Sequence, residues 1–213
     1  MNGQRRSSRA PFIVFEGIDG SGKSTQVQHL ADRLVSLGHR VHVTAEPTSS
    51  LIGSLIRNAF SGRVSMDDRT IAALFAADRL DHLTNDADGV LGLLDAGIIV
   101  ISDRYHLSSH AYHGGDVGSD WVEAANSVST NLLRPDLTIF LDVHPSLAIR
   151  RIETSRIVHD RFEKLSRLEA ARANYYEAIQ QFRAADNVRI ISATDSVLDI
   201  AEAVWVQWEQ IWG

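Results

Sequence analysis

A glycine-rich loop near the N-terminus constrains the fold more than any other part of this sequence. The apolar run FIVF at residues 12–15 has the character of a buried strand, and the loop GIDGSGKS follows at residues 17–24. Every fixed position of the pattern G-x-x-x-x-G-K-[ST] is present, which predicts a loop that binds the phosphates of a nucleotide. An amphipathic segment comes next, so the strand and the helix that such a loop needs are both predicted. Together they favour an α/β fold.

The residue types in this loop suit a polyphosphate. Glycine allows the backbone to turn tightly and bring its N–H groups onto phosphate oxygens, and the dipole of the following helix favours the same anion. Lys23 adds a positive charge for the outer phosphates, and the hydroxyl of Ser24 is suited to hold Mg²⁺. We expect the following residues to bind the nucleotide: Gly17, Asp19, Gly20, Ser21, Gly22, Lys23, Ser24 and Thr25.

Composition limits the classes of protein that this chain can represent. Its 213 residues, 44% of them hydrophobic and 23% charged, fit a single globular domain. A net charge of −6 gives no general surface for nucleic acid or membrane, and no segment approaches the ~18 apolar residues of a membrane span. The absence of cysteine fits a reducing cytoplasm, where we expect the protein to act. We expect residues 1–10 to form a flexible tail and residues 11–213 to form one domain.

Apolar runs and helical patterns alternate along the chain. Runs typical of buried strands occupy residues 12–15, 41–45, 98–102, 137–142 and 188–192. The spacing of Ser65 and Asp68 resembles a capping box and predicts a long helix from there to about residue 88. Five strands alternating with helices predict a three-layer α/β fold, in which helices flank a five-stranded parallel sheet. Ligands of such folds bind beyond the carboxyl ends of the strands.

The phosphate loop by itself leaves several chemistries open, including GTPase switches, motor or partition ATPases, and small-molecule kinases. A GTPase would be expected to carry a guanine-reading N-K-x-D segment, and this chain contains no Asn-Lys pair. Arginines instead follow the predicted strands and helices. They suit a reaction between two phosphate-bearing substrates, because the repulsion of the two polyanions must be neutralised before transfer.

Six segments match one family, in order, along nearly the whole chain. They are EGIDGSGKST at 16–25, EPTSSLIGSLIR at 46–57, LFAADR at 74–79, DRYHLSSHAY at 103–112, RPDLTIFLDV at 134–143 and DRFE at 160–163. In these segments the chain resembles thymidylate kinase, which phosphorylates dTMP with ATP. The resemblance implies a P-loop NTPase fold, ATP as the co-substrate together with Mg²⁺, dTMP as the acceptor, and a homodimer.

The resemblance places the thymine base against Phe75 and Arg79. These residues are four apart in a predicted helix, so they lie on neighbouring positions of one face. In the family the phenylalanine stacks on thymine and the arginine bonds its O4. Stacking of a base on an aromatic ring contributes about 1–3 kcal/mol, and cytosine would present a donor where thymine presents O4.

The resemblance also assigns roles around the third apolar run. It places Asp103 near Mg²⁺ and the transferring phosphoryl group, and Arg57 and Arg104 on the dTMP phosphate. It implies further substrate contacts at Asp19 near the sugar 3′-hydroxyl, Glu46, Ser108, Ser109 near the thymine edge, and Tyr112 under the sugar. Asp142 also ends an apolar run. Periodicity does not choose between the two aspartates, and the resemblance favours Asp103.

The polar segment at about 150–162 resembles the family's lid, which closes over ATP. In some members an arginine of the phosphate loop neutralises the transferring group, and here that position is Gly20. We therefore expect the lid to supply the catalytic arginine, first Arg156 and then Arg161, beside the catalytic residues Lys23, Asp103 and Arg104. Many relatives carry arginine before the Glu-Pro of the second segment, where this chain has Ala45, so we do not assign a role to a charge at that position, while Glu46 and Pro47 remain.

Other functions remain open from the residues. A deoxynucleoside kinase would use the same loop but needs a carboxylate base for its hydroxyl acceptor, and another nucleoside monophosphate kinase is a further alternative. A regulatory ATPase that binds a protein partner is the alternative of another class. His106, His110 and His113 have the spacing of a helical metal site, yet no carboxylate or further histidine lies at companion spacing in this segment, so we do not expect a metal there.

Overall fold

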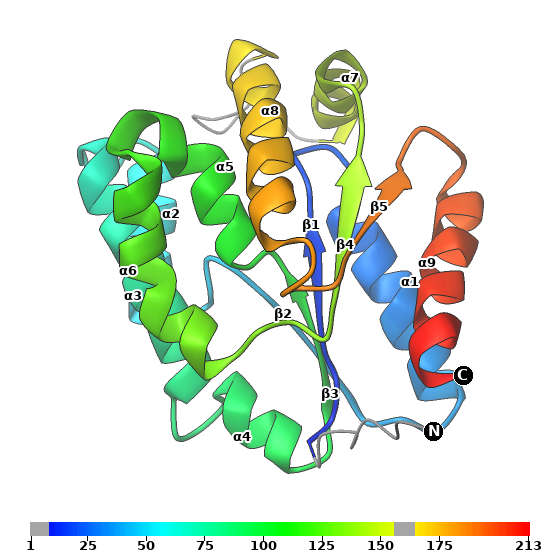
Figure 1. The fold of residues 1–213 in the computed structure, drawn as a ribbon. Helices are drawn as coiled ribbons and strands as arrows, with labels where there is room; N and C mark the ends of the chain where they lie inside the picture. Colours follow the sequence, from blue (N-terminus) through cyan, green and yellow to red (C-terminus); the bar gives the residue numbers. More distant parts are fainter. Residues whose placement is uncertain (1–8, 156–164) are drawn as a thin grey trace.

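The computed structural model describes residues 9–155 and 165–213 (Figure 1). Arg156 and Arg161, the expected lid arginines, lie outside these ranges. Five parallel strands form one sheet in the order β2-β3-β1-β4-β5. Their bounds are β1 Phe12–Glu16, β2 Val41–Ala45, β3 Ile99–Asp103, β4 Leu137–Asp142 and β5 Val188–Ser192. The predicted α/β fold with a five-stranded parallel sheet is therefore confirmed.

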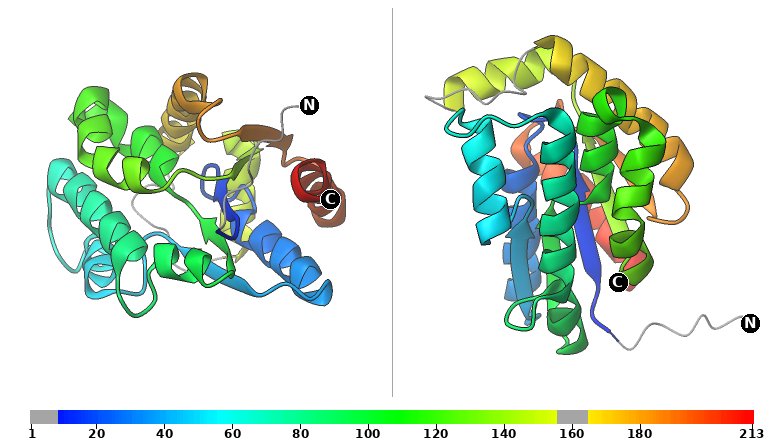
Figure 2. Two further views of the ribbon diagram at one scale, coloured as in Figure 1. Left: turned by 60° about the horizontal axis from the view of Figure 1, so that its bottom comes forward. Right: turned by 90° about the vertical axis from the view of Figure 1, so that its left-hand side faces the viewer.

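Helices cover both faces of the sheet (Figures 1 and 2). α1 and α9 lie on one face, whereas α3, α5, α6 and α8 lie on the other. The helix bounds are α1 Lys23–Ser36, α2 Leu51–Phe60, α3 Asp68–Thr84, α4 Val90–Asp95, α5 His106–Val117, α6 Ser119–Leu132, α7 Pro145–Ser155, α8 Leu165–Phe182 and α9 Val197–Trp212. No helix in the described ranges is long and apolar enough to cross a membrane.

The central strand β1 is buried from end to end because helices cover both of its faces. Phe12 and Val14 pack in a cluster with residues of α3, α4 and β3. Ile13 and Phe15 face the opposite way, into the part of the larger core to which α1 and α9 contribute. Alternate side chains of one strand thus join the two layers of helices to the sheet.

The carboxyl ends of the strands meet at one edge of the sheet. Phe15 pairs with Asp103, and Ala45 pairs with Asp103 from the other side. Asp142 ends β4, the neighbour of β1. The predicted site residues that end or follow β1, β2 and β3 consequently lie together at this edge.

The last residues of the expected tail are attached to the body of the protein. The Ala10 N–H donates to Leu94 O at 3.0 Å, and Arg9 forms an ion pair with Asp136 at 3.2 Å. Residues 9 and 10 thus lead directly into β1.

Candidate active site

The phosphate loop has a backbone shape that requires glycine at two positions. Gly17 has φ 144°, and a Cβ atom there would lie 2.7 Å from Leu141 O. Gly20 has φ 78°, and a Cβ atom there would lie 2.4 Å from Ala148 O. An arginine at residue 20 would therefore collide with α7 in this conformation.

Lys23 is buried inside the loop at the first residue of α1. Its ammonium donates to Gly17 O at 3.0 Å and to Ile18 O at 3.2 Å. Burial lowers the pKa of Lys23 and the charge of Arg104 lowers it further, while nearby carboxylates oppose both effects. The side chain holds a positive charge against the backbone that would surround a phosphate.

Ser24 and Asp103 meet where the loop faces the end of β3. The Ser24 hydroxyl donates to Asp103 Oδ2 at 2.6 Å. Asp103 Oδ1 is buried, and within the part of the chain that the structure describes it has no hydrogen-bond partner. A hydroxyl beside a carboxylate with an unused oxygen is a donor set that suits Mg²⁺.

Asp142, the other candidate aspartate, is already fully engaged. Its two oxygens accept from Arg172 Nε at 2.7 Å and Nη2 at 2.9 Å, and the Tyr176 hydroxyl donates to it at 2.8 Å. Burial alone would raise its pKa, but the hydrogen bonds and charge of Arg172, with the Tyr176 hydroxyl, keep the pKa of Asp142 below its usual range. The geometry separates two aspartates that the sequence pattern does not, because only Asp103 has oxygen atoms available for a cation.

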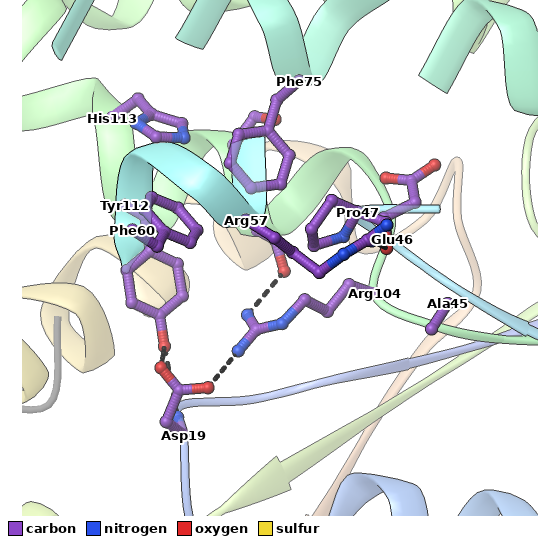
Figure 3. A pocket seen from close by; sticks show the side chains of 12 residues that line it. Asp19, Ala45, Glu46, Pro47, Arg57, Phe60, Phe75, Arg104, Tyr112 and His113 are labelled. Carbon is purple, nitrogen blue, oxygen red and sulfur yellow. Dashed lines mark hydrogen bonds and ion pairs between the residues drawn. The ribbon is translucent and has the colours of Figure 1, made fainter. Parts of the chain in front are cut away.

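A cavity of about 280 Å³ opens above the strand ends (Figure 3). Most of the predicted substrate residues line it; the full lining is Asp19, Ala45, Glu46, Pro47, Arg57, Phe60, Phe75, Arg104, Ser108, Ser109, Tyr112 and His113. One side is aromatic, with the Phe75 ring centroid 5.8 Å from that of Phe60 and 5.3 Å from that of His113. The opposite side carries charged and hydroxyl groups, so the cavity suits a flat apolar ring attached to a polar, anionic group.

Asp19, Arg104 and Tyr112 form a connected group at the polar end (Figure 3). The Arg104 guanidinium contacts the Asp19 carboxylate and donates to Ser108 Oγ at 3.1 Å. The Tyr112 hydroxyl accepts from the Asp19 N–H at 3.1 Å and lies 3.3 Å from Asp19 Oδ2. Burial opposes the charge of Arg104, but the carboxylate of Asp19 raises the pKa of the guanidinium well above its usual value. Arg104 is therefore a permanent cation facing the cavity.

Arg79 lies behind the cavity wall and is fully buried. Its Nε and Nη2 donate to Glu46 Oε2 at 2.9 and 2.6 Å, and Nη2 also donates to Tyr105 O at 3.1 Å. Its Nη1 donates to Ser109 Oγ at 2.9 Å and to the Asn126 side-chain oxygen. These bonds use all five N–H groups of the guanidinium. A direct bond from Arg79 to a base, the predicted role, would thus require one of them to be exchanged.

Glu46 is the buried counter-ion of this arrangement. Burial would raise the pKa of Glu46, but the charge of Arg79 and the contact with His82 at 3.2 Å lower it below its usual range. Glu46 also lines the cavity. The glutamate therefore stays ionised while it holds Arg79 in place.

Arg57 and Ala45 lie at the boundary between two hollows. Both line the cavity, and both also line a groove of about 930 Å³ that includes Ser24 and Asp103. Arg57 donates to Pro47 O at 3.1 Å, to Thr48 O, and to Ser54 Oγ at 3.0 Å. The polar end of the cavity thus opens toward the phosphate loop, as transfer between two bound nucleotides requires.

A third hollow, also of about 280 Å³, lies on the other side of the phosphate loop. Gly20, Ser21, Gly22 and Thr25 line it from the loop, together with Gln26, Arg151, Asp195, Val197 and Ile200. It adjoins the start of α1, where the helix dipole favours anions.

Several residues that hold the site together were not among those predicted from the sequence. Glu16 accepts hydrogen bonds from the start of α5, and Tyr175 donates to Glu16 at 2.9 Å from α8. Asn126 reaches Arg79 from α6. Asp78 accepts from the Thr48 N–H at 2.8 Å and fixes the loop after β2. Only Glu16 and Asp78 could have been suspected from sequence, because each is a carboxylate inside one of the matching segments.

The three histidines of α5 pack against aromatic rings. His110 lies 5.0 Å from the Phe182 ring and His106 lies 5.2 Å from it, between ring centroids. His106 Nε2 also lies 2.7 Å from an oxygen of Asp186. His113 faces Phe75 in the cavity wall, a position that sequence reasoning did not assign to the site.

Comparisons with known proteins show which family this chain resembles. A family model described as thymidylate kinase matches residues 15–204. The chain is 38% identical over 199 residues to a probable thymidylate kinase of Pyrococcus horikoshii, covering 90% of this chain and 92% of the relative. It is 37% identical to a thymidylate kinase of Leuconostoc citreum, covering 91% and 92%. It is 36% identical over 211 residues to one of Bifidobacterium longum, covering 93% and 95%.

Proposed function

The chain belongs to the thymidylate kinase family, and we propose that the cleft above its strand ends carries out that family's reaction. The protein is an ATP:dTMP phosphotransferase, which converts ATP and dTMP into ADP and dTDP. One observation carries the residue-level proposal: the cavity around Phe75 opens, at Ala45 and Arg57, into the groove that contains Ser24 and Asp103. Two nucleotides can therefore meet there with their phosphates facing each other.

ATP binds on the phosphate loop in this proposal. The backbone of residues 17–24 and the ammonium of Lys23 hold its outer phosphates, and the dipole of α1 favours them. The hollow beside the loop, which Arg151 and Asp195 line, receives the nucleoside part of ATP. This places the donor on the opposite side of the loop from the aromatic cavity.

Ser24 and Asp103 are the residues that would hold Mg²⁺. Their adjacent oxygens, one of them buried and unused within the described ranges, support this assignment. When bound there, Mg²⁺ supplies neutralisation of the charge on the outer phosphates of ATP. Asp103 orients this end of the site, and its own contact with Ser24 ties it to the loop.

dTMP occupies the aromatic cavity in this proposal. Its base stacks on Phe75, its sugar lies beside Tyr112 and Asp19, and its phosphate lies between Arg57 and Arg104. Because an oxygen of that phosphate is already anionic near neutral pH, the reaction needs no general base. Positioning and charge neutralisation supply the catalysis, and the arginines prevent repulsion between the two phosphate groups.

Ser109 is suited to distinguish thymine from cytosine at the position of thymine O4. It lines the cavity, and its Oγ accepts a hydrogen bond from Arg79. Its own hydrogen is consequently available to a carbonyl oxygen such as O4 of thymine, and not to the amino group that cytosine carries at that position. Ser109, with Arg79 behind it, thus favours thymine over cytosine.

The lid completes the proposal. Gly20 leaves no room for a side chain at its position, because a Cβ atom would meet the backbone of Ala148. We therefore keep Arg156, and then Arg161, as the arginines that neutralise the transferring phosphoryl group. Both lie outside the described residues. In arginine-finger enzymes such a residue contributes about 10³–10⁵ in rate.

A homodimer fits an apolar face on α6 and α3. Trp121, Val128 and Leu132 are 41%, 54% and 47% exposed, and their spacing of seven and four places them on one side of α6. Leu80 of α3 is also exposed, and α3 packs beside α6. Exposed apolar stripes of this kind support an interface between two copies of the chain. The nucleotide substrates support activity in the cytoplasm.

Product identification tests the proposed reaction directly. Purified protein is incubated with ATP, Mg²⁺ and dTMP, and the nucleotides are separated by ion-exchange chromatography. We expect ADP and dTDP in equal amounts, and we expect neither with a Lys23→Ala variant. ADP formation without dTDP would refute the transfer to dTMP.

A further inference from the structure

Arg104 has an unusual backbone conformation for a residue with a side chain. Its φ is 83°, and Asn187, at 45°, is the one other non-glycine residue in the described ranges with a positive φ. The left-handed region is disfavoured for residues that carry a Cβ atom, and asparagine tolerates it better than arginine. Such conformations persist where surrounding groups fix them, and they cluster at functional sites.

Three backbone groups around Arg104 are fixed by specific partners. The Arg104 N–H donates to Phe15 O at 2.8 Å. The Ser102 hydroxyl donates to Arg104 O at 2.7 Å, and the following N–H, that of Tyr105, donates to Glu16 Oε1 at 2.9 Å. Two of the three partners are side chains, and both are fully buried.

Glu16 also holds the side chain that Arg104 contacts. Its Oε2 accepts from Ser108 Oγ at 2.6 Å, and Ser108 Oγ in turn accepts from Arg104 Nη1 at 3.1 Å. Glu16 Oε1 accepts from the Ser108 N–H at 3.2 Å as well. Tyr105 is the N-cap residue of α5 and its side chain forms no capping hydrogen bond, so Glu16 takes the place of a local capping residue. Glu16 thus fixes the backbone next to Arg104 directly and fixes the guanidinium of Arg104 through Ser108.

We propose that Ser102 and Glu16 are positioning residues for the acceptor phosphate and that they act through Arg104. They hold its backbone in the left-handed conformation that directs the guanidinium to Asp19 and into the cavity. Glu16 ends β1 immediately before the phosphate loop, so one carboxylate sets the position of the acceptor-binding arginine relative to the donor-binding loop. This inference rests on the proposed role of Arg104 in binding the phosphate of dTMP.

The test is a double-mutant cycle on kcat/KM for dTMP at saturating ATP. Ser102→Ala removes the donor to the Arg104 carbonyl, and it is made in the wild-type chain and in an Arg104→Lys background. We expect Ser102→Ala to lower kcat/KM for dTMP at least fivefold in the wild-type chain and less than twofold in the Arg104→Lys background. KM for ATP should stay within twofold, which a general loss of structure would not allow.

Thr138→Val is the matched control. Thr138 is a buried residue of β4, which pairs with β1, and its hydroxyl has no hydrogen-bond partner in the described part of the chain. This variant should keep kcat/KM for dTMP within twofold. Glu16→Gln provides a second variant, since the amide keeps the size of the side chain but has one acceptor oxygen in place of two. It should show the same dependence on Arg104 as Ser102→Ala.

Equal losses in both backgrounds would overturn the inference, because Ser102 and Glu16 would then act independently of Arg104. Wild-type kcat/KM for both Ser102→Ala and Glu16→Gln would overturn it as well. Failure of the proposed function looks different, since the wild-type chain itself would not form dTDP. The two failures are therefore distinguishable in one set of assays.

Discussion

The Ser24 hydroxyl donates to the Asp103 carboxylate at 2.6 Å, so the phosphate loop and the end of β3 meet at one point. Asp142 ends the strand on the other side of β1, yet Arg172 and Tyr176 occupy its carboxylate. The two aspartates are alike in sequence context and differ in their partners. The difference supports the proposal that Asp103, and not Asp142, holds the metal.

Replacing these two aspartates should affect different properties, catalysis for Asp103 and stability for Asp142. Asp103→Asn should lower kcat about 10²-fold, because charge that develops during transfer loses its stabilisation, with little effect on KM for dTMP. Asp142→Asn should keep kcat within a few-fold and lower the free energy of unfolding. Steady-state kinetics and denaturant unfolding of both variants check this. Loss of kcat in Asp142→Asn alone would reverse the assignment.

Base selectivity should depend on Ser109 and Arg79 together. Ser109→Ala should reduce the preference for dTMP over dCMP by up to about tenfold, since a single hydrogen bond contributes about 0.5–1.5 kcal/mol. Arg79→Gln should reduce the same preference and should also destabilise the fold by about 3 kcal/mol or more, because Glu46 loses its buried counter-ion. Ratios of kcat/KM for the two nucleotides measure this. Unchanged ratios in both variants, with Ser127→Ala as the surface control, would exclude the base-reading role.

His110 should make the free energy of unfolding depend on pH. Burial, with the neighbouring charges of His106 and Arg79, lowers its pKa from 6.5 to about 4. The unfolded chain therefore binds a proton at this histidine between pH 6.5 and 4 while the folded chain does not, so the free energy of unfolding falls as pH falls through that window. The loss approaches about 3 kcal/mol. Urea unfolding at pH 7, 6 and 5 should show this slope in the wild type, and His110→Phe should flatten it. An equal slope in His110→Phe would assign the effect to other groups.

The apolar face of α6 should control oligomeric state. Val128→Glu places a charge in the middle of the exposed stripe, and we expect it to convert the proposed homodimer into a monomer because a buried unpaired charge is costly. Light scattering after size-exclusion chromatography measures the mass. Val206→Glu, at an exposed position on α9, is the matched control and should remain dimeric. A dimeric Val128→Glu variant would place the interface elsewhere.

Local patterns predicted most of the fold. The strands are recognised because buried parallel strands are short, continuous apolar runs, and the loop is recognised because its glycines have fixed spacing. The prediction that a capping box at Ser65 opens the long helix was wrong about the residue that caps it and about where the helix ends. Asp67 caps α3 by accepting from the Thr70 N–H at 2.8 Å, and the helix ends at Thr84. Both residues are good caps, so the pattern alone did not fix the start of the helix.

The site was predicted less completely than the fold, because it depends on contacts between residues that lie far apart in the sequence. Helical spacing placed Phe75 and Arg79 on one face, but positions four apart differ by about 40° around a helix axis. That rotation, with Glu46, Ser109 and Asn126 as partners, keeps Arg79 behind the wall that Phe75 lines. No pattern in the sequence brings Asn126 to Arg79, because 47 positions separate them.

The most direct measurement is ADP release from ATP and Mg²⁺ with a panel of acceptors: dTMP, dCMP, dUMP, dAMP and thymidine. We expect dTMP to give the highest rate and dUMP a lower one, since a methyl group in an apolar pocket is worth about 1–3 kcal/mol. dCMP, dAMP and thymidine should stay near background. Thymidine as the preferred acceptor would indicate a deoxynucleoside kinase. A rate of ADP release indifferent to dTMP would indicate an ATPase and contradict the proposed function.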